Sequence, residues 1–358
     1  MNIALFGGSF NPVHKEHFNI AQAAKKTLSL DKLIVIPSHI TPQKSGRLFV
    51  SDEDRLNMCR LAFGEEVSDC EILRGGVSYS YLTCREFKNK YPNDNLYLII
   101  GADSYENFSE WKYPEEILKC VTLAVCGREK PLEDIKGAVK IDYTGKDISS
   151  TKIRALAALG ESLDGYLDEK VTKYIKDNNL YKLSGIEKVK GYLTPERWQH
   201  TVRVTVMAAE NCARFGIDEK QAITAAAWHD CAKYLTAENK ELKGFKLPQG
   251  VPKPIVHQYA GAFVAEHIFG IEDEEVLNAI RYHTSGRENM TNLEKLIYLS
   301  DMLEEGRSFD GVENLRKKFA LGLDEGMLAA LEHTIKYIKS AGGEIYPLTL
   351  KARKYYDK

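Results

Sequence analysis

The residues of this chain that could do chemistry begin in a glycine turn between a predicted strand and a predicted helix. The apolar run 2–6 is typical of a strand buried on both faces, and the apolar spacing over 18–28 is typical of a helix. The turn and the first helical residues read Gly7, Gly8, Ser9, Phe10, Asn11, Pro12, Val13, His14 and, three positions later, His17.

The residue types in this turn suit a phosphate ligand. Glycine lets the backbone approach a ligand closely, and the amides that open a helix favour an anion. His14 and His17 are three residues apart, which places both imidazoles on one face of the first helical turn. The pattern predicts a phosphate site. The alternative is a tight turn whose histidines only cap the helix and pack.

A second cluster follows the predicted strand 139–141 and opens another helix. It consists of Asp147, Ile148, Ser149, Ser150, Thr151, Lys152, Ile153 and Arg154. Hydroxyls at a helix start can donate to phosphate, and Arg154, one turn in, can form a bidentate pair with phosphate oxygens. The alternative is a set of capping hydroxyls with a surface arginine. Beside the first turn, the cluster predicts the other half of one phosphate site.

A third set of residues has the side chains that metals bind. Its members lie on five predicted helices or helix ends: His200, His229, Asp230, His257, His283 and Asp301. Imidazole and carboxylate suit first-row metals, and the adjacent pair His229 and Asp230 would let one carboxylate bridge two ions. Lys233 lies one turn further on the same face. Singly, each histidine could be an ordinary helix residue, but the ordered set predicts a metal centre.

The elements that must position the first two clusters alternate between strands and helices. Strands are expected at 2–6, 33–36, 71–73, 96–100, 121–126 and 139–141. Helical patterns begin at Ser51, with Asp54 three residues on, and occupy 79–87 and 115–118. This order predicts a doubly wound α/β domain with a mostly parallel sheet. Ligands of such sheets bind at the carboxyl ends of the strands, where strand order reverses, and the glycine turn lies at that edge.

The second half of the chain reads differently, because β-branched runs disappear after about residue 184. Helices are expected at 196–215, 218–234, 254–269, 273–282, 292–304 and 323–340. The joint is expected at 178–185. The sequence therefore predicts an α/β domain over residues 1–185 and an all-α domain over residues 186–358.

Bulk composition limits the partners and the compartment. The length of 358 residues favours two domains, and a net charge of −2 offers no broad basic surface for nucleic acid or an anionic membrane. The seven cysteines are odd in number and form no pair of Cys-x-x-Cys motifs, which indicates reduced thiols. There is no apolar run of membrane-spanning length and no leader pattern. We expect a cytoplasmic protein without nucleic-acid or membrane partners.

Together the glycine turn and the segment 148–154 resemble the nucleotidyltransferases with a His-x-x-His turn, and in detail the bacterial nicotinate-nucleotide adenylyltransferases. The resemblance covers residues 1–183 and predicts a Rossmann-like nucleotidyltransferase domain. Further matching segments are 37–44, Arg74 with 78–80, and 101–104 with the downstream Trp111. These segments favour this subfamily over the pantetheine-phosphate and cytidylyl relatives.

The resemblance implies that the phosphate of nicotinate mononucleotide attacks the α-phosphorus of ATP, giving deamido-NAD and pyrophosphate. The nucleophile is already an anion, so the work is positioning and charge neutralisation. By resemblance, His14 and His17 hold the α-phosphate, and Arg154 with Ser150 and Thr151 holds the β and γ phosphates of a nucleotide that carries Mg²⁺. Trp111 contacts the pyridine ring, and Thr83 with nearby amides reads its carboxylate. The remaining expected nucleotide and substrate contacts are Gly7, Gly8, Ser9, Phe10, Lys44, Gly101, Asp103 and Ser149.

Two positions depart from the family pattern. Glu16 stands where the family has a glycine between its two histidines, and Gln43 precedes Lys44 where the family has histidine. Glycine at the first position permits close approach of the nucleotide. The carboxylate of Glu16 must therefore point away from the phosphate or repel it.

The metal-type residues resemble the HD hydrolase superfamily, named for its His-Asp doublet, across about residues 190–345. The segments 228–233, 257–260, 283–286 and 298–304, with Arg307, are similar to the symmetrical diadenosine tetraphosphate hydrolases. By this resemblance the six residues bind two metal ions, expected to be iron, which make a hydroxide that attacks a central phosphorus and releases two ADP. Lys233 and Arg307 are the expected contacts for the polyphosphate.

The sequence thus predicts a bifunctional enzyme that uses ATP, nicotinate mononucleotide and diadenosine tetraphosphate. Two alternatives stay open at this point. The helical half could be a regulatory or dimerising module without turnover, and the acceptor could be nicotinamide mononucleotide or phosphopantetheine. The sequence also leaves a homo-oligomer open.

Overall fold

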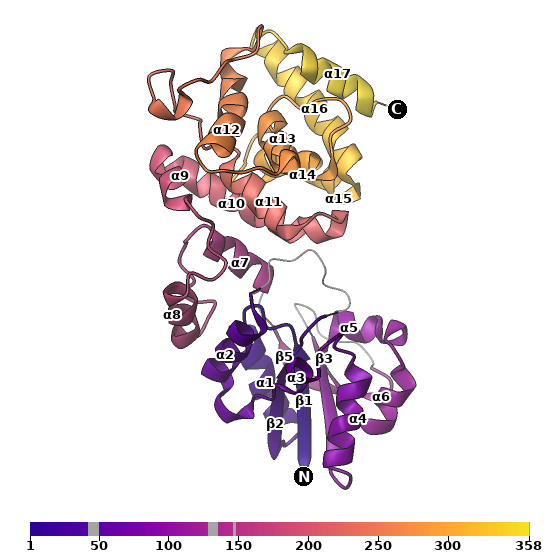
Figure 1. Cartoon of the computed structure of the whole chain (residues 1–358). Helices are drawn as coiled ribbons and strands as arrows, with labels where there is room; N and C mark the ends of the chain where they lie inside the picture. The colour runs from indigo at the N-terminus through magenta and orange to yellow at the C-terminus, as the bar shows by residue number, and fades with distance from the viewer. Residues whose placement is uncertain (42–49, 128–134, 146–147, 358) are drawn as a thin grey trace. The chain divides into compact units, whose positions relative to one another are not determined.

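The computed structural model describes residues 1–41, 50–127, 135–145 and 148–357 (Figure 1). Contacts divide these residues into two compact units. Unit 1 takes in the described residues up to Arg154 together with Ser162–Tyr181, and unit 2 takes in Ala155–Glu161 and the described residues from Lys182 onward. The domain boundary at 185/186 stays a prediction.

Unit 1 is built on a parallel sheet in the order β2-β1-β3-β4-β5. Its strands are β1 (Asn2–Gly8), β2 (Lys32–Pro37), β3 (Asn95–Gly101), β4 (Thr122–Gly127) and β5 (Ala138–Thr144). Leu5 lies in register with Ile34 on one side and Leu98 on the other. The doubly wound α/β class predicted from the sequence is confirmed. Strand order reverses between β1 and β3, so their carboxyl ends form the edge where such sheets bind ligands.

Helices cover the sheet of unit 1. They are α1 (Lys15–Thr27), α2 (Asp52–Phe63), α3 (Cys70–Arg74), α4 (Ser80–Lys90), α5 (Ala102–Glu106), α6 (Pro114–Cys120), α8 (Glu169–Asp177) and the start of α7 (Ser150–Ala158), with short 3-10 helices η1 (Gly64–Glu66) and η2 (Phe108–Glu110). The Ser51 hydroxyl caps α2, as its sequence signal predicts, by accepting the Asp54 N–H at 3.0 Å. Alternate strand residues such as Leu5 and Leu98 pack with Phe87 of α4 and Ile117 of α6 in one apolar core. Figure 1 shows α4 and α6 side by side along that part of the sheet.

The prediction of a strand at 71–73 is wrong, because these residues form α3. An apolar run of three residues is too short to show whether apolar positions recur with the spacing of a strand or of a helix. Gly75 ends the helix at φ +67°, and its N–H donates to the Glu71 carbonyl at 3.2 Å. Beside β2 the described chain instead forms an isolated bridge between Val35 and Val67.

Unit 2 is all helical, as predicted. Its helices are α9 (Ile186–Tyr192), α10 (Pro195–Cys212), α11 (Glu219–Trp228), α12 (Val256–His267), α13 (Glu274–Tyr282), α14 (Asn292–Leu303), α15 (Val312–Leu321), α16 (Leu323–Ser340) and α17 (Pro347–Tyr356), with η3 (Ala213–Phe215), η4 (Lys240–Leu242) and η5 (Lys253–Ile255). Five consecutive residues of α14, 296–300, are buried, because α10, α13 and α16 all pack on it (Figure 1). All six predicted helices are present, and α9, α15 and α17 were not predicted.

The helix expected over 218–234 ends early, at Trp228. After it the backbone makes tighter bonds of the 3-10 type, from Cys231 N–H to the Trp228 carbonyl at 3.0 Å and from Lys233 N–H to the Asp230 carbonyl at 2.9 Å. His229 is the C-cap. The His-Asp doublet therefore sits in a turn rather than within a helix.

Among the described residues, no helix combines the length and the apolar character needed to cross a membrane.

Candidate functional site

The glycine turn holds its two histidines together at the start of α1. His14 is the N-cap in an extended conformation, and its N–H donates to Nδ1 of His17 at 3.1 Å. The ring centroids lie 3.7 Å apart. Because Nδ1 of His17 accepts this bond, the proton of its neutral ring is on Nε2. The local backbone thus presets one tautomer of His17.

Gly8 and Phe10 support this pair from within the fold. The Phe10 ring is 1% exposed and packs edge-on against His17 with centroids 4.9 Å apart. A Cβ on Gly8 would lie 3.1 Å from that ring, and Phe10 itself takes φ +42°. The glycine is needed because the ring occupies the space that a side chain would take. The Phe10 ring is thus buried, and the expected contact of Phe10 with the nucleotide stays a prediction.

The second cluster lies directly against the turn. Arg154 is 1% exposed, donates from Nη1 to the Asn11 carbonyl at 2.6 Å and from Nη2 to Thr151 Oγ1 at 3.0 Å. The Ser150 hydroxyl donates to the Pro12 carbonyl at 3.1 Å. Ser149 caps the same segment by accepting the Lys152 N–H at 3.1 Å. The fold therefore brings together the two segments that the sequence singled out, although Asp147 lies outside the described residues.

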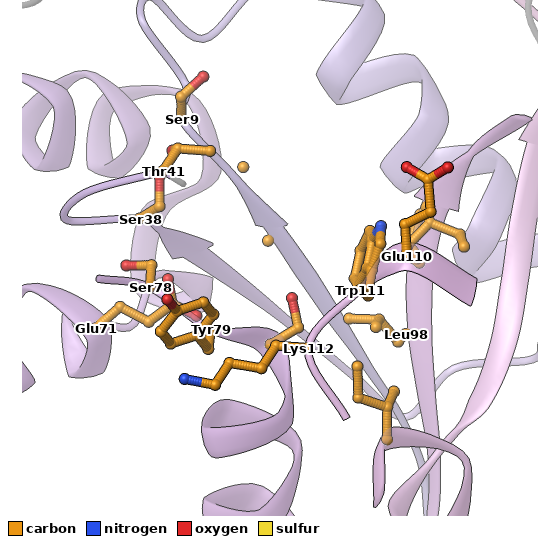
Figure 2. A pocket seen from close by; sticks show the side chains of 16 residues that line it. Ser9, Ser38, Thr41, Glu71, Ser78, Tyr79, Leu98, Glu110, Trp111 and Lys112 are labelled. Atoms are coloured by element: carbon orange, nitrogen blue, oxygen red, sulfur yellow. The ribbon is translucent and has the colours of Figure 1, made fainter. Parts of the chain in front are cut away.

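A cavity of about 530 Å³ opens at the carboxyl ends of β1 and β3. Gly7, Gly8 and Ser9 form part of its wall. Figure 2 shows Trp111 and Glu110 on one side and a group of polar side chains on the other: Ser38, Thr41, Glu71, Ser78 and Tyr79. Trp111 also packs on the Phe108 ring at 5.4 Å between centroids. The cavity lies where the strand order predicts a ligand.

Several expected contacts do not line this cavity. Thr83 is 4% exposed, and its hydroxyl donates to Glu71 Oε1 at 2.5 Å while accepting from Arg74 at 3.1 Å. Gly101 ends β3 and Asp103 lies in α5, and neither is among the lining residues. Lys44 and Gln43 lie outside the described residues.

The charged residues that line the cavity, Glu71, Glu110 and Lys112, were not predicted from the sequence. Glu71 was assigned to a strand, although its spacing from Arg74 and the glycines that follow is a helix-end signal. Lys112 reaches over the Tyr79 ring, with Nζ 4.2 Å from its centroid, and adds a positive charge to the cavity wall. No sequence signal pointed to Lys112 beyond its place after Trp111.

In unit 2 the metal-type residues gather around Asp230. Two groups have ligand atoms that lie within 4.8 Å of one another, namely His200 with His229 and Asp230, and Asp230 with His257 and His283. Asp230 is common to both. Asp301 Oδ1 lies 2.9 Å from His200 Nε2 and 4.0 Å from His229 Nε2, which adds it to the first group. Five helices thus bring all six residues to one place.

Hydrogen bonds on the far side of the rings aim their Nε2 atoms inward. His229 Nδ1 donates to the Ala226 carbonyl at 2.6 Å, and His283 Nδ1 donates to the Ile280 carbonyl at 2.7 Å. His200 Nδ1 lies 3.0 Å from Glu304 Oε1. A proton held on Nδ1 leaves the Nε2 lone pair facing the cluster, which is the arrangement of metal-binding histidines.

The buried polar atoms of the cluster fit a divalent metal. His229 Nε2 and both carboxylate oxygens of Asp230 are buried without a hydrogen bond of good geometry among the described residues, although cations lie near Asp230 as ion pairs. The Nε2 atoms of His257 and His283 face each other at 3.1 Å. Such atoms are costly unless a ligand satisfies them. Burial, with His283 and Lys233, lowers the pKa of His257 to about 3. Charged carboxylate and neutral imidazole are the metal-binding forms.

Three cations border the cluster. Lys233 Nζ lies 3.1 Å from His257 Nε2, and Arg307 Nη2 donates to Asp301 Oδ1 at 2.7 Å. The third, Arg197, places Nη1 3.0 Å from Asp230 Oδ2 and was missed. Its position three residues before His200, on the same helix face, was the signal that could have found it.

Comparisons with known proteins match the two halves separately and together. The cytidylyltransferase-like family model matches residues 5–156, and the HD domain model matches residues 197–306. A Mycoplasma genitalium protein named "Probable nicotinate-nucleotide adenylyltransferase/Ap4A hydrolase" is 28% identical over 362 aligned residues, covering 98% of this chain and 97% of that protein.

Two further relatives match one half each. A Borreliella afzelii protein named "Probable nicotinate-nucleotide adenylyltransferase" is 39% identical over 187 residues, covering 51% of this chain and 97% of that protein. A solved structure from Clostridium acetobutylicum, described as a "predicted HD superfamily hydrolase involved in NAD metabolism", is 34% identical with a TM-score of 0.43, covering 48% of this chain and 95% of that one.

Proposed function

The chain belongs, through its N-terminal half, to the bacterial nicotinate-nucleotide adenylyltransferases and carries an HD domain in its second half, and from this we propose that it is a bifunctional enzyme. Unit 1 transfers the adenylyl group of ATP to nicotinate mononucleotide and releases pyrophosphate. Unit 2 hydrolyses diadenosine tetraphosphate to two ADP.

The observation that carries the first activity is the direct contact between the histidine turn and the Ser149–Arg154 segment. The phosphate that attacks ATP is already an anion, so the enzyme must align it and neutralise charge on the α-phosphate. His14 and His17 contact that phosphate, with the Nε2 proton of His17 as a preset donor. Arg154, held by Asn11 and Thr151, provides fixed positive charge for the β and γ phosphates of Mg²⁺-bound ATP.

The cavity beside the turn is the proposed acceptor site. Trp111 offers an aromatic wall to the pyridine ring, and Ser38 and Ser78 line the opposite side of the cavity (Figure 2). Lys112 is the lining cation that we propose attracts an anionic nicotinate, and the lining carboxylates of Glu71 and Glu110 oppose this attraction. Since the Thr83 hydroxyl is bound to Glu71, backbone amides rather than this side chain remain to read the carboxylate.

Pyrophosphate release with three acceptors at equal concentration tests this activity. We expect nicotinate mononucleotide to exceed nicotinamide mononucleotide and phosphopantetheine. His17→Ala should lower kcat by roughly 10²–10³-fold, the usual cost of losing one transition-state donor. His229→Ala is the matched control and should leave adenylyl transfer unchanged. Equal rates with the nicotinamide acceptor would show that the substrate assignment is wrong.

The second activity is supported by the buried donor set around Asp230. His200, His229, Asp230, His257, His283 and Asp301 would hold two first-row transition metal ions, with iron as the proposed metal. Two ions in such a site supply a hydroxide nucleophile and neutralise charge on phosphoryl oxygens. Lys233, Arg307 and Arg197 border the donors and contact the polyphosphate through charge-assisted bonds. A purely structural site would not need these cations, which favours turnover over a regulatory module.

Metal analysis of the purified chain and chromatography of the products of diadenosine tetraphosphate test this activity. We expect two metal ions per chain and ADP as the sole product. His229→Ala should abolish hydrolysis while adenylyl transfer continues. Unchanged hydrolysis in this variant would exclude the proposed centre.

We also propose that the protein is cytoplasmic. All seven cysteines are free thiols, including the buried Cys59 and Cys231, as a reducing compartment favours.

A further inference from the structure

Glu16, which departs from the family glycine, makes specific contacts in the fold. It lies between His14 and His17 in the first turn of α1, and it is 4% exposed. The Tyr143 hydroxyl donates to Glu16 Oε2 at 2.8 Å, and the Asn19 amide donates to Oε1 at 3.0 Å. These bonds satisfy both oxygens of a buried carboxylate, which would otherwise be costly.

The partner Tyr143 belongs to the strand that leads to the second phosphate segment. α1 packs against β5, and Tyr143 is the penultimate residue of that strand. Two residues later the chain passes directly beneath the carboxylate, because a Cβ on Gly145 would lie only 2.9 Å from Glu16 Oε2. Glycine at position 145 therefore leaves the space that the Glu16 carboxylate occupies.

The hydrogen bond from Tyr143 is available at every physiological pH. Burial, and then the bond to Glu16, raises the pKa of Tyr143 to about 12. The hydroxyl therefore keeps its proton and remains a donor. A donor from a strand to a carboxylate on a helix is a fixed link between the two elements.

We propose that Glu16 is a positioning residue for ATP: its bond to Tyr143 ties the histidine helix to the end of β5 and so sets the Ser149–Arg154 segment opposite His14 and His17. The proposal rests on the adenylyl transfer proposed above. The bond from Ser150 to Pro12 holds the start of the same segment against the turn, and the bond from Arg154 to Asn11 holds its end. The link through Glu16 holds Tyr143, at the end of the strand that precedes this segment in the sequence.

This placement predicts an effect on one substrate and not the other. Neither Glu16 nor Tyr143 lines the cavity assigned to the acceptor. Small misplacement of phosphate-binding groups weakens binding and slows transfer steeply, since the enzyme works by positioning. Breaking the link should therefore raise the KM for ATP and leave the KM for nicotinate mononucleotide unchanged.

Three variants of the full chain test the proposal. Tyr143→Phe removes the donor, Glu16→Gly restores the family residue without the link, and Glu16→Gln keeps an oxygen that can accept from Tyr143. We expect the first two to raise the KM for ATP, and the equilibrium Kd for ATP by calorimetry without acceptor, about tenfold. Glu16→Gln should stay within about twofold of the parent, and Glu16→Gly with Tyr143→Phe should be no worse than either alone.

Tyr174→Phe is a matched control, because the Tyr174 hydroxyl donates to Asp54 Oδ1 at 3.0 Å in another part of unit 1. It should leave both KM values unchanged. Equal changes in the two KM values, additive effects in the double variant, or a Gln variant as impaired as the Gly variant would each overturn the role of the link. A parent chain that neither binds ATP nor releases pyrophosphate would instead overturn the proposed function itself. Thermal unfolding of each variant separates loss of the link from loss of the fold.

Discussion

At the scale of single residues, the candidate metal centre includes buried side chains that contact the proposed ligands and are not ligands themselves. Glu304 is 1% exposed and lies beside His200 Nδ1, while Arg203 donates to its other oxygen at 2.5 Å. Burial would raise the pKa of Glu304, but His200 and Arg203 lower it to about 2. A charged carboxylate in this place fixes the direction of the His200 ring.

Replacing that carboxylate should loosen the metal. We expect Glu304→Gln to weaken metal binding about 10–100-fold, because a neutral amide orients the imidazole less firmly. Competition against a chelator with a known affinity measures the change. Glu294→Gln is the control, since Glu294 is a similarly buried carboxylate near the start of α14, the helix that Glu304 follows, and it pairs with Arg287 instead. Equal metal affinity in parent and Glu304→Gln would rule out the orienting role.

Arg197 supports a separate prediction for the polyphosphate. Its guanidinium lies between solvent and Asp230, with 23% of the side chain exposed. Arg197→Met should lower kcat/KM for diadenosine tetraphosphate roughly 10–100-fold, the cost of one or two charge-assisted hydrogen bonds. Initial rates at several substrate concentrations measure it. The control Arg281→Met replaces a partly exposed arginine that pairs with Glu274, and it should leave kcat/KM for diadenosine tetraphosphate unchanged. A large fall in metal content with Arg197→Met would contradict a role in substrate binding.

At the scale of elements, the packing of α17 shows how an unpredicted helix is secured. Tyr356 of α17 is 9% exposed, and its hydroxyl accepts the Met290 N–H at 3.1 Å. Burial raises the pKa of Tyr356 to about 12. In the unfolded chain a tyrosine ionises near pH 10. The raised pKa means that its contribution to stability is complete below pH 10 and is lost as pH rises towards 12.

The loss of stability caused by Tyr356→Phe should therefore depend on pH. At neutral pH the variant leaves the Met290 N–H unpaired, and the free energy of unfolding should fall by about 1–2 kcal/mol. Between pH 10 and 12 the parent loses stability through the ionisation of Tyr356, and the variant does not. The difference between their free energies of unfolding should therefore become smaller over this range. Denaturant titrations at stepped pH measure it. Tyr337→Phe, at a side chain that is 67% exposed, should show no such narrowing.

At the scale of the whole molecule, each unit has its own candidate site with its own ion requirement. In unit 1 the cation arrives with ATP, whereas in unit 2 the chain itself supplies the buried donors around Asp230. Ala155 and Ala158 of α7 belong to a buried cluster with Ala209 and Ile223, although the sequence reading placed α7 in the first domain. A short alanine-rich stretch carries no signal of which core it joins.

Removing metal should separate the two activities. After treatment with a chelator and return of Mg²⁺ alone, we expect hydrolysis to be lost and adenylyl transfer to persist. A ligand present at about 1,000 times its Kd adds about 4 kcal/mol to the free energy of unfolding. Removing the metal should therefore lower the unfolding temperature of unit 2. The variant His229→Ala lacks one proposed metal ligand, so treatment with the chelator should change its unfolding temperature little. Parallel loss of both activities would contradict independent sites.

The sequence by itself determined the parallel sheet class, the helical second half, most of the strands and helices, and the six metal-type residues that gather around Asp230. This information is local: a period of apolar residues, a glycine turn before a helix, a capping serine at position 51, and histidines at helix ends. Only the tertiary structure decided that Glu16 turns to Tyr143, that Thr83 binds Glu71 and that Arg197 reaches Asp230. These outcomes depend on which side chains from distant segments meet in the folded chain, because a buried polar group takes its partner from whatever neighbour packing supplies.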